Sequence, residues 1–98
     1  MKKIKAYIKR PDEAIGHSTW ISNTLENLQN IVGGYIETVS FGDLIIICNE
    51  EGRILGMPHN CTIHNVDFCG DIIAVGIDED DFGDVPISFD EWKEVING

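Results

Sequence analysis

Thiols and imidazoles that could bind a metal ion are concentrated just after the middle of the chain. His59, Cys61, His64 and Cys69 lie there, and Cys48 is a further thiol that the fold could bring close. Zinc in proteins takes four sulfur or nitrogen ligands, usually presented as close pairs. Cys61 and His64 have the spacing of one such pair, and the other residues supply no second pair. We therefore favour buried thiols and surface imidazoles over a metal site, and we expect no metal and no cofactor.

The same residues meet only loosely the requirements of nucleophilic catalysis. A reactive thiol needs a neighbouring base, which His59 or His64 could supply to Cys61. The sequence offers no identifiable orienting group or oxyanion-binding turn, and no predicted helix begins at Cys61 to lower the pKa of its thiol. The sequence thus favours an inert thiol and predicts that the protein is not an enzyme.

Carboxylates are densest between Asp78 and Asp84, where five of seven residues are acidic. Calcium binds such oxygen ligands, but the EF-hand pattern fails, because Phe82 and Phe89 stand at positions that require ligands. We interpret this stretch as a solvated acidic loop. It is the centre of the surface that we expect to bind a partner.

A second set of residues could bind an anionic small molecule. Gly56, Pro58 and Asn60 alternate through a predicted turn, and Arg53 lies nearby. Turn amides, an amide side chain and a guanidinium together suit an anion. This arrangement is the alternative to the acidic surface.

Charge and composition limit the possible partners. The chain has 98 residues and a net charge of −10. Its residues 11–98 carry two basic and 17 acidic side chains, a net charge of −15, because the other basic residues all lie in the first ten positions. The negative charge of residues 11–98 disfavours binding to nucleic acid or to anionic membranes and favours a partner protein with a basic surface.

The same sequence predicts a cytoplasmic location. The basic start runs into further charged residues where a signal peptide would have an apolar segment. The longest apolar run, from Leu44 to Cys48, is too short to span a bilayer. An odd number of cysteines, three, is typical of reduced thiols.

The first third of the chain predicts a strand, a loop and a helix. Residues 4–9 alternate, which predicts a strand whose exposed face carries Lys5, Tyr7 and Lys9, and a loop covers residues 10–17. Residues 18–21 either add a short strand or lead into the helix. Apolar residues at helical spacing predict an amphipathic helix near residues 23–33, with Ser22 or Asn23 as its N-cap and Gly33 as its stop.

The remainder predicts further strands and a second helix. Residues 35–41 and 44–48 have the pattern of a β-hairpin, and residues 53–57 predict a third strand of a central meander. Residues 44–47 are apolar throughout, which is typical of a strand covered on both faces. Residues 58–70 show no period, residues 71–77 predict another strand, and a short helix near 88–97 begins with a capping box of Ser88 and Glu91. The expected fold is a single α+β domain over residues 1–98, with about five mostly antiparallel strands.

Three segments in order resemble a family of short proteins of unknown function common in phages and gut metagenomes. They are Leu25–Glu37, Asn49–Asn60, which is similar to the motif NEEG-x-x-x-G-x-P-x-N, and Gly70–Gly76, which is similar to GD-I/V-I-x-x-G. The resemblance implies an α+β fold and an origin in a phage, prophage or other mobile element. Relatives often carry a basic residue where this chain has Cys61, so any ligand contact of that residue is absent here.

These observations lead to one main hypothesis and two alternatives. The main hypothesis is a non-enzymatic phage or mobile-element accessory protein that inhibits a host defence factor through an acidic surface. The alternatives are an oligomeric sponge that sequesters a nucleotide-like immune signal, and a structural homodimer formed through sheet edges and the region of Trp20. The partner-binding residues of the main hypothesis are Asp78, Glu79, Asp80, Asp81, Asp84, Glu50 and Glu51.

Overall fold

A computed structural model describes residues 2–97 of the chain. Within this range the order of helices and strands is β1 (Lys3–Lys9), β2 (His17–Ser22), α1 (Leu25–Val32), β3 (Ile36–Phe41), β4 (Leu44–Asn49), β5 (His59–Ile63), β6 (Val66–Cys69), β7 (Ile72–Asp78), β8 (Asp81–Gly83) and α2 (Phe89–Asn97).

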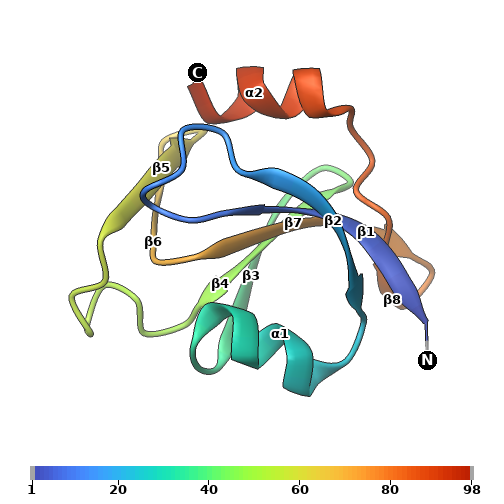
Figure 1. Cartoon of the computed structure of the whole chain (residues 1–98), viewed down its shortest axis with the longest axis horizontal. Coiled ribbons are helices and arrows are strands. Elements are labelled where there is room, and N and C mark those ends of the chain that lie inside the picture. The colour runs from blue at the N-terminus through green and yellow to red at the C-terminus, as the bar shows by residue number, and fades with distance from the viewer. Residues whose placement is uncertain (1, 98) are drawn as a thin grey trace.

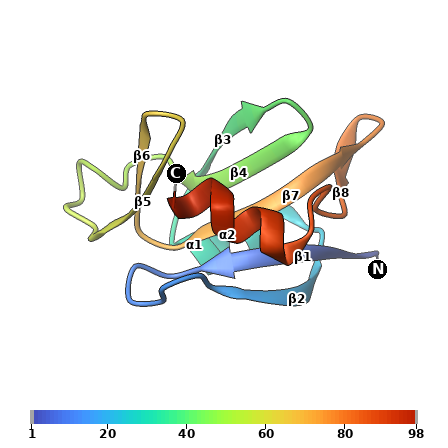
Figure 2. The same cartoon turned by 90° about the horizontal axis from the view of Figure 1, so that it is seen from above.

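One antiparallel sheet forms the middle of the molecule (Figure 1). Its strands lie in the order β2-β1-β7-β4-β3, β8 pairs with the end of β7, and β5 and β6 form a separate hairpin (Figure 2). The expected α+β class, with a mostly antiparallel sheet and two helices, is confirmed.

The central strands are the two that have continuous apolar runs. All six residues of β4 are buried, as are the first five of β7. Successive side chains of a strand point to opposite faces, so Ile45 and Ile47 enter the core on one face and Leu44 and Ile46 the core on the other. The expectation that residues 44–47 form a strand covered on both faces is confirmed.

Different elements cover the two faces of the sheet. The face below in Figure 1 is covered by α1, which buries Leu28 and Val32. The face above is covered by α2 and the β5–β6 hairpin, which bury Trp92, Ile96 and Phe68. Trp92 is fully buried, and its indole N–H donates to the carbonyl of Ile15 at 2.9 Å, so this tryptophan is a core residue.

The helix ends agree with the sequence except at one position. The N-cap of α1 is Thr24, whose hydroxyl accepts from the amide of Asn27, so the expectation of Ser22 or Asn23 is wrong by one or two residues. Gly33 ends the helix at φ +80°, a conformation that glycine adopts without strain. The expected capping box of α2 is present, with Ser88 and Glu91 bonding each other's amides at 3.1 and 3.2 Å.

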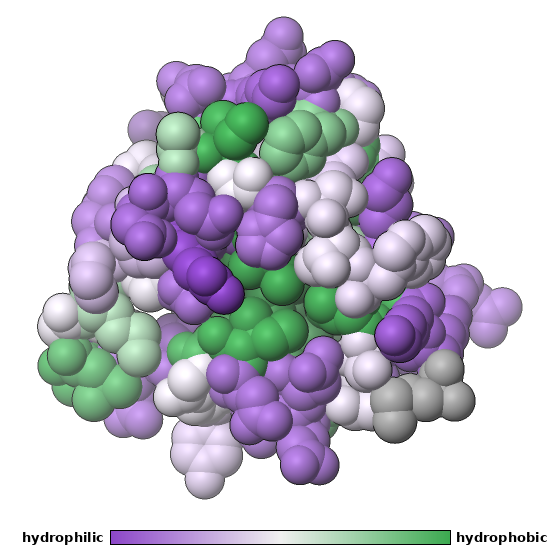
Figure 3. Space-filling view, in the orientation of Figure 1, coloured by the Kyte–Doolittle hydropathy of each residue, from purple (hydrophilic) through white to green (hydrophobic). Residues whose placement is uncertain are grey.

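Residues 53–57 do not form the expected third strand of a meander. They belong to a series of tight turns, in which the amide of Leu55 bonds the carbonyl of Glu51 and the amide of Met57 bonds that of Gly52. The apolar residues of this segment predicted a buried strand, but Ile54, which is 83% exposed, and Leu55 point into solvent. Figure 3 shows apolar side chains at the outer end of this loop, at the lower left.

Residues 58–70, expected to be irregular, contain the β5–β6 hairpin. Its two-residue turn consists of His64 and Asn65, which both have positive φ, as a type I′ turn requires. The apolar residues Ile63 and Phe68 face the core. The polar residues between them obscured the alternation in the sequence, and a register shift between His59 and Cys61 interrupts it.

The exposed face predicted for the first strand is wrong in its second half. Tyr7 is buried, and its hydroxyl donates to the carbonyl of Ile87 at 2.7 Å. Lys9 is also buried, only 4% exposed. Tyr7 lies against α2 and the segment before it, and Lys9 contacts Asn60 of β5, which no local pattern in β1 could indicate.

Candidate functional site

The acidic stretch forms a hairpin at one end of the sheet. The end of β7 pairs with β8 through Ile77 with Phe82 and Asp78 with Asp81, so only residues 79 and 80 form the turn. The expectation of a loop throughout is therefore corrected for residues 81–83, which are a strand. Gly76 permits the return of the chain, because a Cβ atom there would collide with the carbonyl oxygen of Asp84.

Carboxylates and one apolar side chain are exposed on this hairpin. Residues 78–81 and Asp84 are all exposed, and Ile77 beside them is 54% exposed. In the part of the chain that the structure describes, no hydrogen bond or ion pair involves the side chain of Glu79 or Asp80. These two carboxylates are therefore free for a partner.

The other acidic residues of the hairpin hold it against its neighbours. Asp84 accepts from the backbone amide of Lys5 at 2.9 Å, and the amide of Val85 donates to the carbonyl of Lys5. Asp81 accepts from the side-chain amide of Asn23 at 3.1 Å. Substitution of these carboxylates would thus alter the fold as well as the charge.

The basic start of the chain lies against this acidic hairpin. The ammonium of Lys2 bonds the carboxylate of Asp78 at 2.9 Å, and this bond, together with the charge of Asp78, raises the pKa of Lys2. Because both side chains are more than half exposed, water screens the pair strongly. The charge of the hairpin is therefore partly neutralised by its own chain.

Glu50 and Glu51 lie at the other end of the sheet. β4 and β7 are antiparallel, with Ile45 opposite Val75 and Ile47 opposite Ile73. The residues that follow β4 therefore lie where β7 begins, away from the hairpin where β7 ends. The structure does not bring the seven predicted partner-binding residues into one surface. Five of them, residues 78–81 and Asp84, lie on the hairpin, and the other two lie at the opposite end of the sheet.

Two further carboxylates also have local partners. Asp67 accepts from the hydroxyl of Thr62, and this bond, with a smaller effect of His59, holds its pKa below the usual range. Burial raises the pKa of Asp71, and the charge of Arg10, 3.9 Å away, opposes this effect in part.

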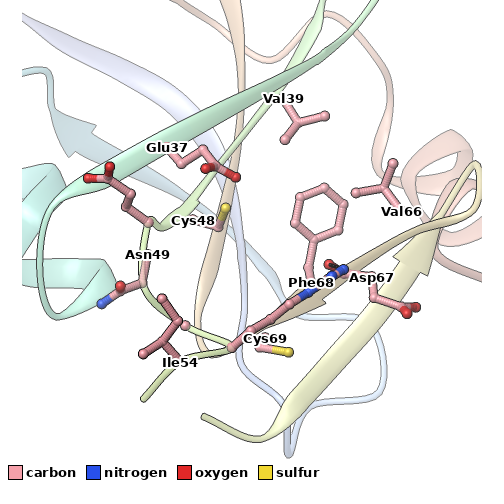
Figure 4. A pocket seen from close by; sticks show the side chains of 12 residues that line it. Glu37, Val39, Cys48, Asn49, Ile54, Val66, Asp67, Phe68 and Cys69 are labelled. Atoms are coloured by element: carbon pink, nitrogen blue, oxygen red, sulfur yellow. Dashed lines mark hydrogen bonds between the residues drawn. The ribbon is translucent and has the colours of Figure 1, made fainter. Parts of the chain in front are cut away.

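The residues of the predicted anion site are spread over different parts of the surface. Arg53 donates to the carbonyl of Asp67 at 3.2 Å and lines a cavity of about 380 Å³ together with Glu37, which stands above Cys48 in Figure 4. Pro58 lines a different cavity, and Gly56 lies in a turn at φ +70°. Within one chain these residues do not converge on a ligand.

Asn60, the fourth residue of that predicted site, is buried and serves the fold. Its side-chain N–H groups donate to the carbonyls of Lys9 at 2.7 Å and Gly70 at 2.8 Å. Its side-chain oxygen accepts from the ammonium of Lys9 at 3.0 Å. Sequence reasoning missed this pairing, because the only signal was an asparagine after a proline and an alternating strand that placed Lys9 in water.

The thiols and imidazoles do not assemble. No group of three histidine, cysteine or acidic residues within 2–97 has the geometry to hold a metal ion. Burial raises the pKa of Cys61, and burial with the charge of Glu37 raises that of Cys48 to about 11. Both thiols are therefore protonated at neutral pH and are poor nucleophiles.

Neither helix of the described chain is long and apolar enough to cross a membrane. No curated protein and no solved structure is significantly similar to the sequence. One family profile, described as a domain of unknown function (DUF3846), matches residues 4–96. This match covers nearly the whole chain, and the protein therefore belongs to the DUF3846 family.

Proposed function

We propose that this protein is a non-enzymatic binding module that modulates a partner protein through the acidic hairpin of β7 and β8. One observation carries the proposal: the carboxylates of Glu79 and Asp80 are exposed and unpaired at the tip of a hairpin that the rest of the fold holds in place. A rigid site loses little conformational entropy on binding, which favours affinity.

The chemistry of the hairpin suits a basic protein surface. Clustered carboxylates accelerate the encounter with such a surface and select it over acidic ones. The exposed Ile77 adds an apolar group at the base of the turn, where a partner would exclude water. Basic protein surfaces are commonly those that bind nucleic acid, so occupation of such a surface would inhibit its owner.

The biological setting of the proposal rests on the resemblance to phage and metagenome proteins. In that setting the partner is a host factor in the cytoplasm, and the protein counters host defence. The net charge of −10 argues against direct binding to nucleic acid or to anionic lipid.

Charge reversal at the hairpin tip tests the proposal. The double variant E79K/D80K changes the two carboxylates without structural partners, and the matched control E26K/E94K makes the same change of charge on exposed positions of α1 and α2. Each protein, immobilised, is incubated with lysate of a host cell and the retained proteins are quantified by mass spectrometry. We expect E79K/D80K to lose the basic proteins that wild type and control retain. Equal retention by all three would refute the proposal.

A second candidate, a homodimer, is favoured by one observation. Trp20 is 59% exposed on β2, which is an edge strand of the sheet. Open edges and exposed aromatic residues are typical of interfaces. Sedimentation should then show a dimer that Trp20→Ser weakens, whereas a wild-type monomer at all concentrations would exclude it.

A further inference from the structure

A cavity of about 560 Å³ is lined by residues of β5 and of the C-terminal end of α2. These two elements lie close together in the fold (Figure 1). Its lining includes Lys9, Asn60, Cys61, Thr62, His64 and Asn97. Cavities of this size hold small ligands or parts of larger ones. It lies at the opposite end of β1 from the acidic hairpin and is independent of the function proposed above.

The lining of this cavity contains no carboxylate among the residues that the structure describes. Each of the four other cavities described has at least one, in a chain with 17 acidic residues. The carboxylate of Asp67 on the neighbouring strand β6 lies 3.6 Å from Nε2 of His59 and accepts from Thr62, so it is already engaged outside the lining. An anion in the cavity would therefore avoid much of the repulsion that the rest of the surface imposes.

Lys9 gives the cavity a buried positive charge that only neutral groups balance. Its ammonium bonds Oδ1 of Asn60 at 3.0 Å and the carbonyls of Asn60 and Arg10 at 3.4 Å, and it forms no ion pair with any carboxylate in the described chain. A buried charge is costly unless an opposite charge accompanies it. Two of the three bonds are longer than usual, so these hydrogens can turn to a stronger acceptor.

Further donors surround the same space. The side-chain amide of Asn97 and the imidazole of His64, which packs against the ring of Phe41, both lie at its wall. The Lys9 charge also reaches Cys61, since it opposes the rise in the pKa of this thiol that burial causes. The field of Lys9 therefore extends into the cavity.

We propose that this cavity binds a small molecule that carries a phosphate group, with Lys9 as the counter-charge. Tetrahedral phosphate has several acceptor oxygens, which suits one ammonium surrounded by amide and imidazole donors. This site differs from the predicted one of Arg53, Gly56 and Pro58, and it assigns Asn60 the task of orienting Lys9.

Titration with inorganic phosphate, followed by backbone amide NMR shifts at constant ionic strength, tests the site. We expect saturable shifts confined to β5, the end of β1 and the end of α2. A parallel titration with adenosine monophosphate distinguishes free phosphate from a phosphate ester, since an ester that uses the cavity will bind more tightly. Shifts that grow without saturation or spread over the surface in both titrations would refute the proposal.

Variants locate the charge that binds. Lys9→Met keeps the aliphatic stem but removes the charge. It should weaken phosphate binding by about tenfold or more, which is the usual effect of losing one charge-assisted hydrogen bond. Asn97→Asp adds a carboxylate at the exposed rim, where it should weaken binding by about fivefold without disturbing the core. Asn30→Asp makes the same change on α1 and should leave binding unaltered. Equal weakening by both Asp variants, or unchanged affinity in Asn97→Asp, would overturn the assignment.

Discussion

Lys9 and Asn60 illustrate what a single residue contributes beyond its local pattern. Asn60 satisfies two carbonyls of other segments and also holds the Lys9 ammonium. It thereby joins β1, β5 and the segment before β7. Period-two alternation predicted an exposed Lys9. Alternation describes one strand alone, so it could not indicate that Asn60, 51 residues later, contacts this lysine.

Substitutions of Asn60 and of Lys9 should lower the free energy of unfolding by unequal amounts. Asn60→Ala leaves two buried carbonyls and a buried charge without their partner, and we expect it to lower the free energy of unfolding by about 3 kcal/mol. Lys9→Met removes the charge itself and should cost about 1 kcal/mol. Urea unfolding measures both, with the exposed Asn30→Ala as a control. An Asn60→Ala protein as stable as the control would contradict the role of this amide.

The thiol of Cys48 should make the fold sensitive to alkaline pH. Its pKa is about 11 in the folded protein, above the ordinary value of 9.0, because burial and Glu37 disfavour the thiolate. The folded state therefore binds this proton more tightly than the unfolded state. The resulting stability is complete below pH 9 and is lost as the pH rises towards 11.

Cys48→Ala isolates that contribution. Thermal unfolding of the wild type and the variant from about pH 8, below the ordinary thiol pKa, up to the raised value of about 11 gives two curves of stability against pH. The wild type should decline more steeply than Cys48→Ala. Parallel curves would show that Cys48 titrates in the folded protein as it does in the unfolded chain.

At the scale of elements, the continuous apolar runs of the central strands and the helical spacing of apolar residues gave reliable predictions, whereas the N-cap of α1 was misplaced. β4, β7 and both helices were recognisable because burial on one or two faces imposes a pattern on consecutive residues. β5 and β6 were not recognised, since their outward faces carry polar residues and their turn uses His64 and Asn65 at positive φ. Ile54 and Leu55, in the turns after β4, have the sequence pattern of a strand but are exposed. Burial depends on what packs against a segment, which its own sequence does not show.

Glycines in two elements should respond differently to alanine. At Gly76 a Cβ atom would collide with the backbone of the acidic hairpin, and Gly76→Ala should cost about 3 kcal/mol or more and displace β8. At Gly33 a Cβ atom would have no neighbour within 4 Å, so Gly33→Ala should cost only the strain of its left-handed φ, about 1 kcal/mol. Chemical denaturation compares them, and equal costs would contradict the close approach at Gly76.

At the scale of the whole molecule, the distribution of charge was only partly predictable. The sequence showed a basic start and an acidic remainder, and antiparallel pairing determined which acidic residues meet that start. Lys2 lies beside Asp78, whereas Glu50 and Glu51 lie at the opposite end of the sheet. The proposed partner-binding surface, the acidic hairpin, is therefore smaller than the composition implied, and Lys2 neutralises part of its charge.

Removal of the neutralising charge should strengthen binding to a basic partner. Lys2→Ala leaves Asp78 without its ion pair, and the hairpin then carries one more uncompensated charge. We expect roughly twofold tighter binding at low salt and an almost unchanged unfolding temperature, because exposed ion pairs contribute little to stability. Weaker binding would mean that the partner recognises Lys2 itself.

The central claim, recognition of a basic partner by the acidic hairpin, is tested most directly by the salt dependence of the dissociation constant. For a partner retained by the wild type, calorimetry at several salt concentrations gives the slope of log Kd against log salt for the wild type, E79K/D80K and E26K/E94K. Binding through the hairpin predicts at least a tenfold weaker complex and a shallower slope for E79K/D80K, at about 1 kcal/mol for each lost pair, with the control close to the wild type. The same affinity and slope for all three proteins would contradict it.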